Sequence, residues 1–215
     1  LTLDQSLSSI TDAAGNAMSS THSADETYTV DRENPTVTSI TPDDAGPTNA
    51  DALNFAVVFG EPVINVDMTD LDITTSESVA IAETQLSGSG FEYTLTLSGL
   101  SGDGTITVNL DTSTDIADPA DNDLDTGASP AQVTIDNTAP GVTINTLATN
   151  DPSPDLSGTV NDAQATVTLS VPGQTPIIAV NDGTGSWSAT AGLITTLTEG
   201  IYDVSASVED AAGNS

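Results

Sequence analysis

The chain has 215 residues, of which 32 are acidic and one is basic, so its formal net charge is −31. Because nucleic acids and anionic membranes are bound through Lys and Arg side chains that neutralise phosphate, this charge excludes both as partners and favours cations or basic surfaces. The lack of cysteine excludes disulfide bonds, thiolate zinc sites and thiol catalysis, and no apolar run approaches the length that inserts into a membrane.

Short runs in which apolar and polar residues alternate dominate the chain, and this period of two predicts β-strands. In chain order the clearest runs are 53–59, 91–97, 106–110, 167–171 and 202–208. Gly, Asn and Asp supply turns between the runs. Helical spacing is hard to find, and aromatic residues make up only 3% of the chain. We therefore expect an all-β sandwich with thin cores of Val, Ile, Leu and Ala.

One five-residue phrase recurs along the chain. Asp12–Asn16 and Asp210–Asn214 both read Asp-Ala-Ala-Gly-Asn, and Asp118–Asn122 is a diverged copy. Such recurrence indicates a repeat protein. Because the phrase places hard oxygen donors at the same point of successive repeats, it predicts sites for divalent cations, with calcium favoured. Zinc and softer metals are disfavoured, since there is no thiol and His22 is the only histidine.

Domain boundaries are marked by a strand followed by an acid, a polar stretch and a proline. This pattern occurs at 28–35 and again at 133–140. It predicts that residues 1–33 are the C-terminal strands of a first module, that 34–137 are a complete second module, and that 138–215 are a third module lacking its last strand. Both ends of the chain are expected to fall inside modules of a longer protein.

These residues carry a resemblance to a known family. The recurring phrase, Asp136–Pro140, Gly158–Ala163 and Phe59–Val63, taken in this order, resemble the bacterial immunoglobulin-like (Ig-like) tandem repeats of large surface adhesins, which are exported by type I secretion and carry RTX segments. The resemblance implies tandem, seven-stranded Greek-key sandwiches. It also implies an extracellular location at the bacterial cell surface, and calcium ions at the module junctions that stiffen a long stalk.

The Ig-like topology predicts where ligands converge. The B–C and F–G loops lie at one end of such a sandwich, next to the linker that precedes it. For the second module the candidate metal ligands are Asp31, Glu33, Glu61, Asp118, Asp121, Asn122 and Asp123. For the third they are Asp136, Asn137, Asn161, Asp162, Asp210 and Asn214. Asp12 and Asn16 are the corresponding residues of the first module, whose other ligands would lie before residue 1.

Simpler interpretations compete with the metal hypothesis. The recurring phrase could be only a turn, in which Asp accepts local hydrogen bonds and Gly supplies a positive φ. The acids could be the solvated surface of a halophilic protein. Five further acids, Asp43, Asp44, Asp67, Asp70 and Asp72, are expected to be solvated loop residues, with an additional ion at the opposite end of the module as the alternative. Trp187 could stack on a carbohydrate, but its alternating surroundings favour a place in a sandwich core.

The function predicted from these features is structural. No catalytic motif is present, and so few aromatic residues can hardly line a substrate cleft, so we expect a non-enzyme. The leading hypothesis is a calcium-stiffened extender of a cell-surface adhesin, whose partners are the neighbouring modules of the same chain. One alternative is a subunit of a surface filament or layer in which residues 25–31 complete another copy by strand addition. A further alternative is a module that binds a glycan or a host protein.

Overall fold

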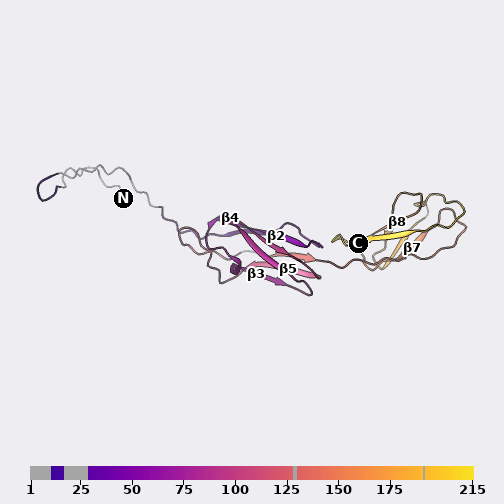
Figure 1. Ribbon diagram of the computed structural model, residues 1–215, viewed down its shortest axis with the longest axis horizontal. Helices are drawn as coiled ribbons and strands as arrows, with labels where there is room; N and C mark the ends of the chain where they lie inside the picture. The colour runs from indigo at the N-terminus through magenta and orange to yellow at the C-terminus, as the bar shows by residue number, and fades with distance from the viewer. Residues whose placement is uncertain (1–10, 17–28, 128–129, 191) are drawn as a thin grey trace. The chain divides into compact units, whose positions relative to one another are not determined.

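The structure, a computed structural model, describes residues 11–16, 29–127, 130–190 and 192–215 (Figure 1). The chain divides into two compact units, Leu1–Glu33 and Asn34–Ser215. The described residues of the first unit are the turn at Asp12 and the segment that leads to Asn34. The second unit consists of strands and one three-residue 3-10 helix, η2 (Met68–Asp70), so the all-β prediction is confirmed.

Six strands form two antiparallel sheets within the proposed second module. They are β1 (Val37–Pro42), β2 (Ala52–Val63), β3 (Leu71–Thr75), β4 (Glu83–Ser98), β5 (Gly104–Leu110) and β6 (Ala131–Ile135). The sheet orders are β1-β2-β4 and β3-β5-β6, so the chain changes sheet after β2, β3 and β4, as in a Greek-key sandwich. Among the described residues of this module there are six strands, one fewer than the seven that the resemblance implies. In addition to the six strands, Thr48 makes one isolated parallel bridge to Ile135.

The alternation in the sequence correctly predicts which side chains fill this core. Leu53, Phe55, Val57 and Phe59 of β2 are at most 2% exposed, because every second residue of the strand faces the opposite sheet. On β4 the same rule holds for buried Leu95 and Leu97 but fails for Phe91, which is half exposed. The apolar face of that run is therefore shorter than the sequence suggests.

The proposed third module has its own core between two smaller sheets. Its strands are β7 (Leu156–Thr159), β8 (Thr166–Ser170), β9 (Ile177–Ile178), β10 (Val180–Asn181), β11 (Ser186–Ala189) and β12 (Ser205–Glu209). The sheet orders are β10-β11-β7 and β12-β8-β9. Trp187 of β11 is 1% exposed, and its indole N–H donates to the carbonyl of Thr143 at 2.9 Å. It is a core residue, as the alternation predicts.

Asp70 corrects one expectation about the acids. It is 2% exposed rather than solvated. Its carboxylate accepts hydrogen bonds from the Asp67 backbone N–H and the Thr114 hydroxyl, each at 2.7 Å. The first of these bonds completes the cap of η2, so the carboxylate has a structural role. Asp43, Asp44, Asp67 and Asp72 are exposed, although Asp72 lies in β3 rather than in a loop.

Candidate metal centre

The recurring phrase folds into the same turn in every copy. In the β5–β6 connection, one carboxylate oxygen of Asp118 accepts the backbone N–H groups of Ala120 and Asn122 at 2.8 Å. The other oxygen accepts the Asn122 side-chain amide at 2.7 Å. Asp12 and Asp210 make the corresponding three bonds within their own loops at 2.8 to 2.9 Å. The phrase is therefore a local turn, as the simpler interpretation predicts, and the turn leaves the metal hypothesis open.

The fourth residue of the turn needs a left-handed backbone. Its φ is 85° at Gly15 and 88° at Gly213, a region that glycine enters without steric cost. In the diverged copy Asp121 occupies the same position with φ 70°. The turn thus keeps its shape where the sequence has changed, at the cost of placing a residue with a Cβ in a strained region.

These hydrogen bonds keep the turn aspartates ionised. At Asp118 the Asn122 side-chain amide and backbone N–H outweigh the effect of burial and hold the pKa below its ordinary value of 3.8. At Asp210 burial is the largest single influence and raises the pKa, but the donors of Asn214, Ala212 and Gly213 together lower it. The Asn16 donors lower the pKa of Asp12 in the same way. Charged carboxylates are the form that a cation requires.

Backbone pairing explains why Glu61 and Asp118 come together. The N–H of Ile64, just after β2, donates to the carbonyl of Ala117 at 2.8 Å, so the end of β2 runs beside the start of the Asp118 turn. Glu61 therefore lies in strand β2, whereas the sequence placed it in the B–C loop. The reason for the difference is that β2 continues past the Glu61-Pro62 step to Val63.

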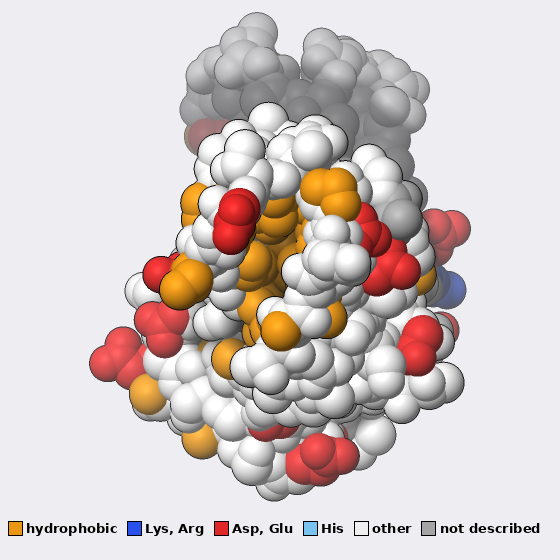
Figure 2. Space-filling view, turned by 90° about the vertical axis from the view of Figure 1, so that its right-hand side faces the viewer, with side chains coloured by type: hydrophobic (Ala, Val, Ile, Leu, Met, Phe, Trp, Pro, Cys, Tyr) orange, Lys and Arg blue, Asp and Glu red, His pale blue; other side chains and the backbone are white. Residues whose placement is uncertain are grey.

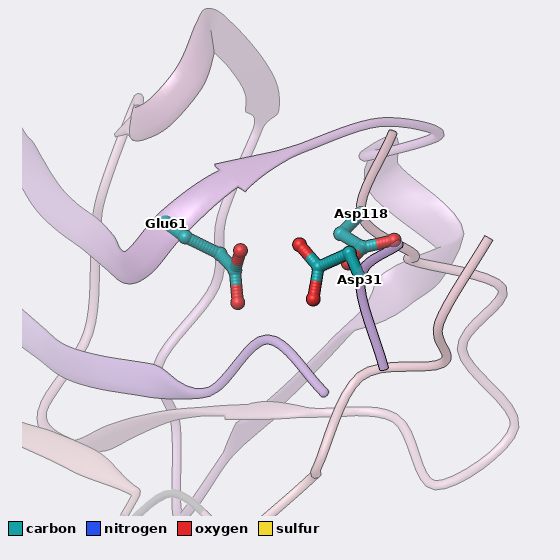
Figure 3. A group of neighbouring side chains, drawn as sticks. All are labelled: Asp31, Glu61 and Asp118. Carbon is teal, nitrogen blue, oxygen red and sulfur yellow. The ribbon is translucent and has the colours of Figure 1, made fainter. Parts of the chain in front are cut away.

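Asp31 completes a group of three carboxylates with Glu61 and Asp118. One oxygen of each lies within 4.8 Å of the others, and Figure 3 shows Glu61 extending from β2 toward Asp31 and Asp118. Asp31 belongs to the segment that leads into Asn34. Four residues after Asp31, the backbone carbonyl of Pro35 accepts the backbone N–H of Asp125 at 2.9 Å. Asp118 is 1% exposed, Glu61 is partly buried and Asp31 is exposed. This group could hold a metal ion.

The other predicted ligands of the second module take other places. The backbone N–H of Glu33 donates to the Asp31 carboxylate at 3.1 Å, which shapes the segment before the module. Asn122 uses its amide nitrogen on Asp118. Asp121 and Asp123 flank Asn122 in the same turn, but neither belongs to the group of three carboxylates. Whether any of these residues binds an ion stays a prediction.

The corresponding place before the third module is organised around an amide instead. The Asn214 side-chain nitrogen donates to the backbone carbonyl of Asp136 at 2.8 Å as well as to Asp210. The Asn214 side-chain oxygen accepts the amide of Asn49 at 3.1 Å. The linker and the Asp210 turn therefore converge, as the topology predicts, through Asn214. Among the described residues, Asp136, Asp162 and Asp210 do not form a second group of three close carboxylates.

Asp103, in the turn between β4 and β5, holds the linker on its other side. Its carboxylate accepts the Asn137 backbone N–H and the Thr138 hydroxyl, each at 2.6 Å. The Thr138 hydroxyl, followed by the Asn137 backbone N–H, lowers the pKa of Asp103. Asn137 also donates its side-chain amide to the Gly102 carbonyl at 2.8 Å. The predicted ligand Asn137 is thus committed to a linker contact.

Two more predicted ligands shape the loops beside this linker. The side-chain oxygen of Asn161 accepts the Gly141 backbone N–H at 2.6 Å. Asp162 accepts the Gln164 backbone N–H at 2.8 Å. A shallow cleft of about 470 Å³ lies here, and its acidic lining residues are Glu77, Asp103, Asp136 and Asp162. An ion bound at this junction stays a prediction.

Sequence reasoning missed Asn49 and Asp103. Both belong to turns at the end of the second module that faces the following linker, and neither lies in a repeated motif. The available signal was the shortness of the linker at 136–140, because a short linker must contact the module that it leaves as well as the one that it enters.

Comparison with known proteins supports the fold. Residues 130–215 match the family model of the bacterial Ig-like domain. The resemblance to bacterial Ig-like repeats is therefore confirmed for this part of the chain, which includes the third module. The comparison with curated proteins found no match.

One similar solved structure is the crystal structure of the S-layer protein rSbsC(31-844). It is 18% identical with a TM-score of 0.30, over 85% of this chain and 33% of that chain. The chain thus spans about a third of that protein's length. In the described part of the chain, no helix is long and apolar enough to cross a membrane.

Proposed function

We propose that the chain is a non-catalytic, calcium-binding spacer from a bacterial cell-surface adhesin, built of tandem Ig-like modules. The observation that carries the proposal is the group formed by Asp31, Glu61 and Asp118, where a segment entering a module meets two parts of that module. The match of residues 130–215 to the bacterial Ig-like domain supports the setting. We also propose that the parent protein is exported by type I secretion.

The geometry suits a calcium ion. Calcium binds oxygen ligands at about 2.3 to 2.6 Å, so two ligands on opposite sides of one ion are separated by about 5 Å at most. Oxygens that lie within 4.8 Å of one another can therefore share one ion with little movement. Calcium also tolerates an irregular ligand set, which a strand, a turn and an exposed segment would supply. Backbone carbonyls and water would complete the coordination.

The electrostatics explain why the ion would stiffen the chain. Three ionised carboxylates repel each other when no cation lies between them, and the donors of Asn122 keep Asp118 charged even though it is buried. A bound cation converts this repulsion into three attractive contacts. Because Asp31 precedes the module by only a few residues, the ion would fix the direction in which the chain enters it.

The test is calcium binding by the whole chain and by two variants. Glu61→Gln keeps the shape of the side chain but removes its charge, and we expect the affinity to fall roughly tenfold or more, as for the loss of a group that supports a metal. Asp72→Asn is the control, because Asp72 is exposed on β3 and lies outside the group. Equal calcium affinity for Glu61→Gln and the unchanged chain would contradict the site.

Small-angle scattering distinguishes stiffening of the chain from calcium binding alone. The proposal expects the maximum dimension of the chain in solution to increase between EGTA and excess calcium, and it expects Glu61→Gln to reduce that increase. Calcium binding with an unchanged maximum dimension would leave a metal site but would refute the role as a stiffened spacer.

Glycan binding and self-assembly remain alternatives of unequal support. Trp187 is buried in the core, so it offers no face on which a sugar could stack. The segment proposed for strand addition, residues 25–31, lies largely outside the described residues.

A further inference from the structure

The two ends of the second module are joined directly to each other. Thr36, where the chain enters the module, forms a parallel bridge with Asp125, and Thr48, which follows β1, forms a parallel bridge with Ile135 of the last strand β6. The first and last parts of the module therefore run side by side in the same direction. It follows that the chain enters the module at one end and leaves it at the other, as Figure 1 shows.

Thr48 shares two backbone hydrogen bonds with the exit strand. The Thr48 N–H donates to the Thr134 carbonyl at 3.1 Å, and the Asp136 N–H donates to the Thr48 carbonyl at 3.0 Å. Thr48 is 6% exposed, so little water competes for these bonds. Because the two segments are parallel, a force that pulls the ends of the module apart slides one segment past the other and loads both bonds at once. Bonds that are loaded together resist more force than bonds that open one after another.

The turn before Thr48 is shaped to hold this residue against β6. The Asp44 carboxylate accepts the Gly46 N–H at 2.9 Å, and this bond, followed by one from the Thr48 hydroxyl, lowers the pKa of Asp44. A charged acceptor strengthens such bonds. Gly46 has a φ of 69°, and a Cβ there would lie 2.7 Å from the Thr134 carbonyl oxygen, so glycine is required for this approach to β6. We call residues 44–48 the clasp.

The residue that follows the clasp connects it to the third module. The Asn49 amide donates to the Asn214 side-chain oxygen at 3.1 Å. The Asn214 amide donates to the Asp136 carbonyl at 2.8 Å, while the backbone N–H of the same Asp136 donates to Thr48. A force transmitted from the third module along the linker therefore reaches the second module at the residue that the clasp holds.

The charge of the protein indicates that such a force is carried along a single chain. A net charge of −31 makes separate copies repel each other. On the face shown in Figure 2, acidic side chains lie on several sides of the view, so the repulsion is not confined to one patch. Where lateral contacts do not share the load, tension passes through each module in turn.

We propose that the clasp is a load-bearing device, which fastens the exit strand β6 to the entry segment and so lets the second module resist tension along the chain. The inference rests on the proposed role as a spacer for the source of the tension. It does not rest on calcium, because the bonds that hold the clasp involve none of the three carboxylates Asp31, Glu61 and Asp118.

The experiment stretches the full chain at constant force in EGTA. Because the chain lacks cysteine, the substitutions Leu1→Cys and Ser215→Cys provide the two thiols for attachment. Unfolding of residues 34–137 lengthens the chain more than unfolding of residues 138–215 does, since an extended chain gains about 3.5 Å per residue. The lifetime of each module under force is therefore measured separately. Hydrogen exchange of the β5 amides without force reports the stability of the second module.

Two pairs of variants distinguish the clasp from general stability. Gly46→Ala places a Cβ against β6, and its control Gly88→Ala places one at 2.4 Å from a backbone carbonyl within β4. Asp44→Ala removes the acceptor of the clasp. Its control Asp111→Ala removes a carboxylate that accepts the backbone N–H and the hydroxyl of Ser113 in the β5–β6 connection.

We expect Gly46→Ala to unfold at least about tenfold faster under force and Asp44→Ala about threefold faster, because the weakened contacts are those that the force must break. The controls should lower the stability measured by hydrogen exchange but change the rate under force by less than about twofold. Equal acceleration of each variant and its control would overturn the proposal. So would an unchanged rate for Asp44→Ala, which decides the question if Gly46→Ala does not fold.

Calcium has no part in this readout. An unchanged rate under force in the clasp variants would leave the metal site standing, whereas a chain that binds no calcium would still show the effect of the clasp. The two proposals therefore fail separately.

Discussion

Asn214→Ala tests how the third module is joined to the second. Asn214 is 9% exposed and links three groups: the Asp210 carboxylate, the Asp136 carbonyl and the Asn49 amide. The bond to Asp210 shapes the turn, while the other two bonds leave the turn and reach the linker and the second module. Alanine removes all three, and we expect the third module to become less stable.

The magnitude follows from the three lost bonds. A hydrogen bond in a folded protein contributes about 1 kcal/mol net, so their loss should lower the free energy of unfolding of the third module by about 3 kcal/mol. Asn49→Ala removes only one of them and should cost about a third as much. Because the two residues are bonded directly, the double variant should lose less than the sum of the single variants.

The assay is urea unfolding followed by Trp187 fluorescence in EGTA. Trp187 is the only tryptophan and lies in the core of the third module, so it reports this module alone. Asn122→Ala is the control for an effect from elsewhere in the chain, since it removes the same turn contacts with Asp118 in the second module and should leave the Trp187 transition unchanged. Additive effects of Asn214→Ala and Asn49→Ala, or a cost of Asn49→Ala below about 0.2 kcal/mol, would refute the proposed coupling.

Three further predictions use other features. Gly158→Ala would place a Cβ at 1.9 Å from the Thr143 carbonyl and 2.7 Å from the Trp187 ring. It should destabilise the third module by about 2 to 4 kcal/mol in the same assay, whereas Gly200→Ala, which meets only Tyr202 at 3.6 Å, should not. Asp121→Gly should stabilise the second module by about 0.5 to 1 kcal/mol in calorimetry by relieving the positive φ, and an equal gain from Asp121→Asn would point to charge instead. Because the pKa values of Asp118 and Asp210 are lowered from 3.8, the stability that they provide is complete above about pH 4 and is lost as pH falls through their folded values. Melting temperatures in EGTA should reflect this, and a decline that Asp210→Asn leaves unchanged would contradict it.

The strands were predictable because burial imposes a period of two on any strand that has one face in a core. The run from Leu53 to Phe59 obeys this rule throughout, and so does the stretch around Trp187. Phe91 escapes it because a strand can extend beyond the core that its other residues cover. The periodicity identifies the face of a strand, but it does not show where the opposite sheet ends.

The candidate site was only partly predictable, because the hydrogen-bond partners of its residues lie far away in the sequence. Asp118 stands in a repeated phrase, so its position could be inferred by comparing the modules. Asp70 could not be distinguished from solvated acids, since the hydroxyl that its carboxylate accepts belongs to Thr114, which is far away in sequence. Asn49 and Asp103 were missed for a similar reason, since their partners follow much later in the chain: Asn49 donates to Asn214, and Asp103 accepts from the linker residue Asn137.

The two equivalent turns differ in what their neighbours require. Around Asp118 the neighbours are two further carboxylates, Asp31 and Glu61, which repel unless a cation lies between them. Around Asp210 the neighbours are an amide and a peptide carbonyl, which bind each other directly. Removal of calcium should therefore increase hydrogen exchange at Asp31–Glu33 much more than at Asn137–Gly141. Comparable increases at both segments in EGTA would show that the second junction also depends on an ion.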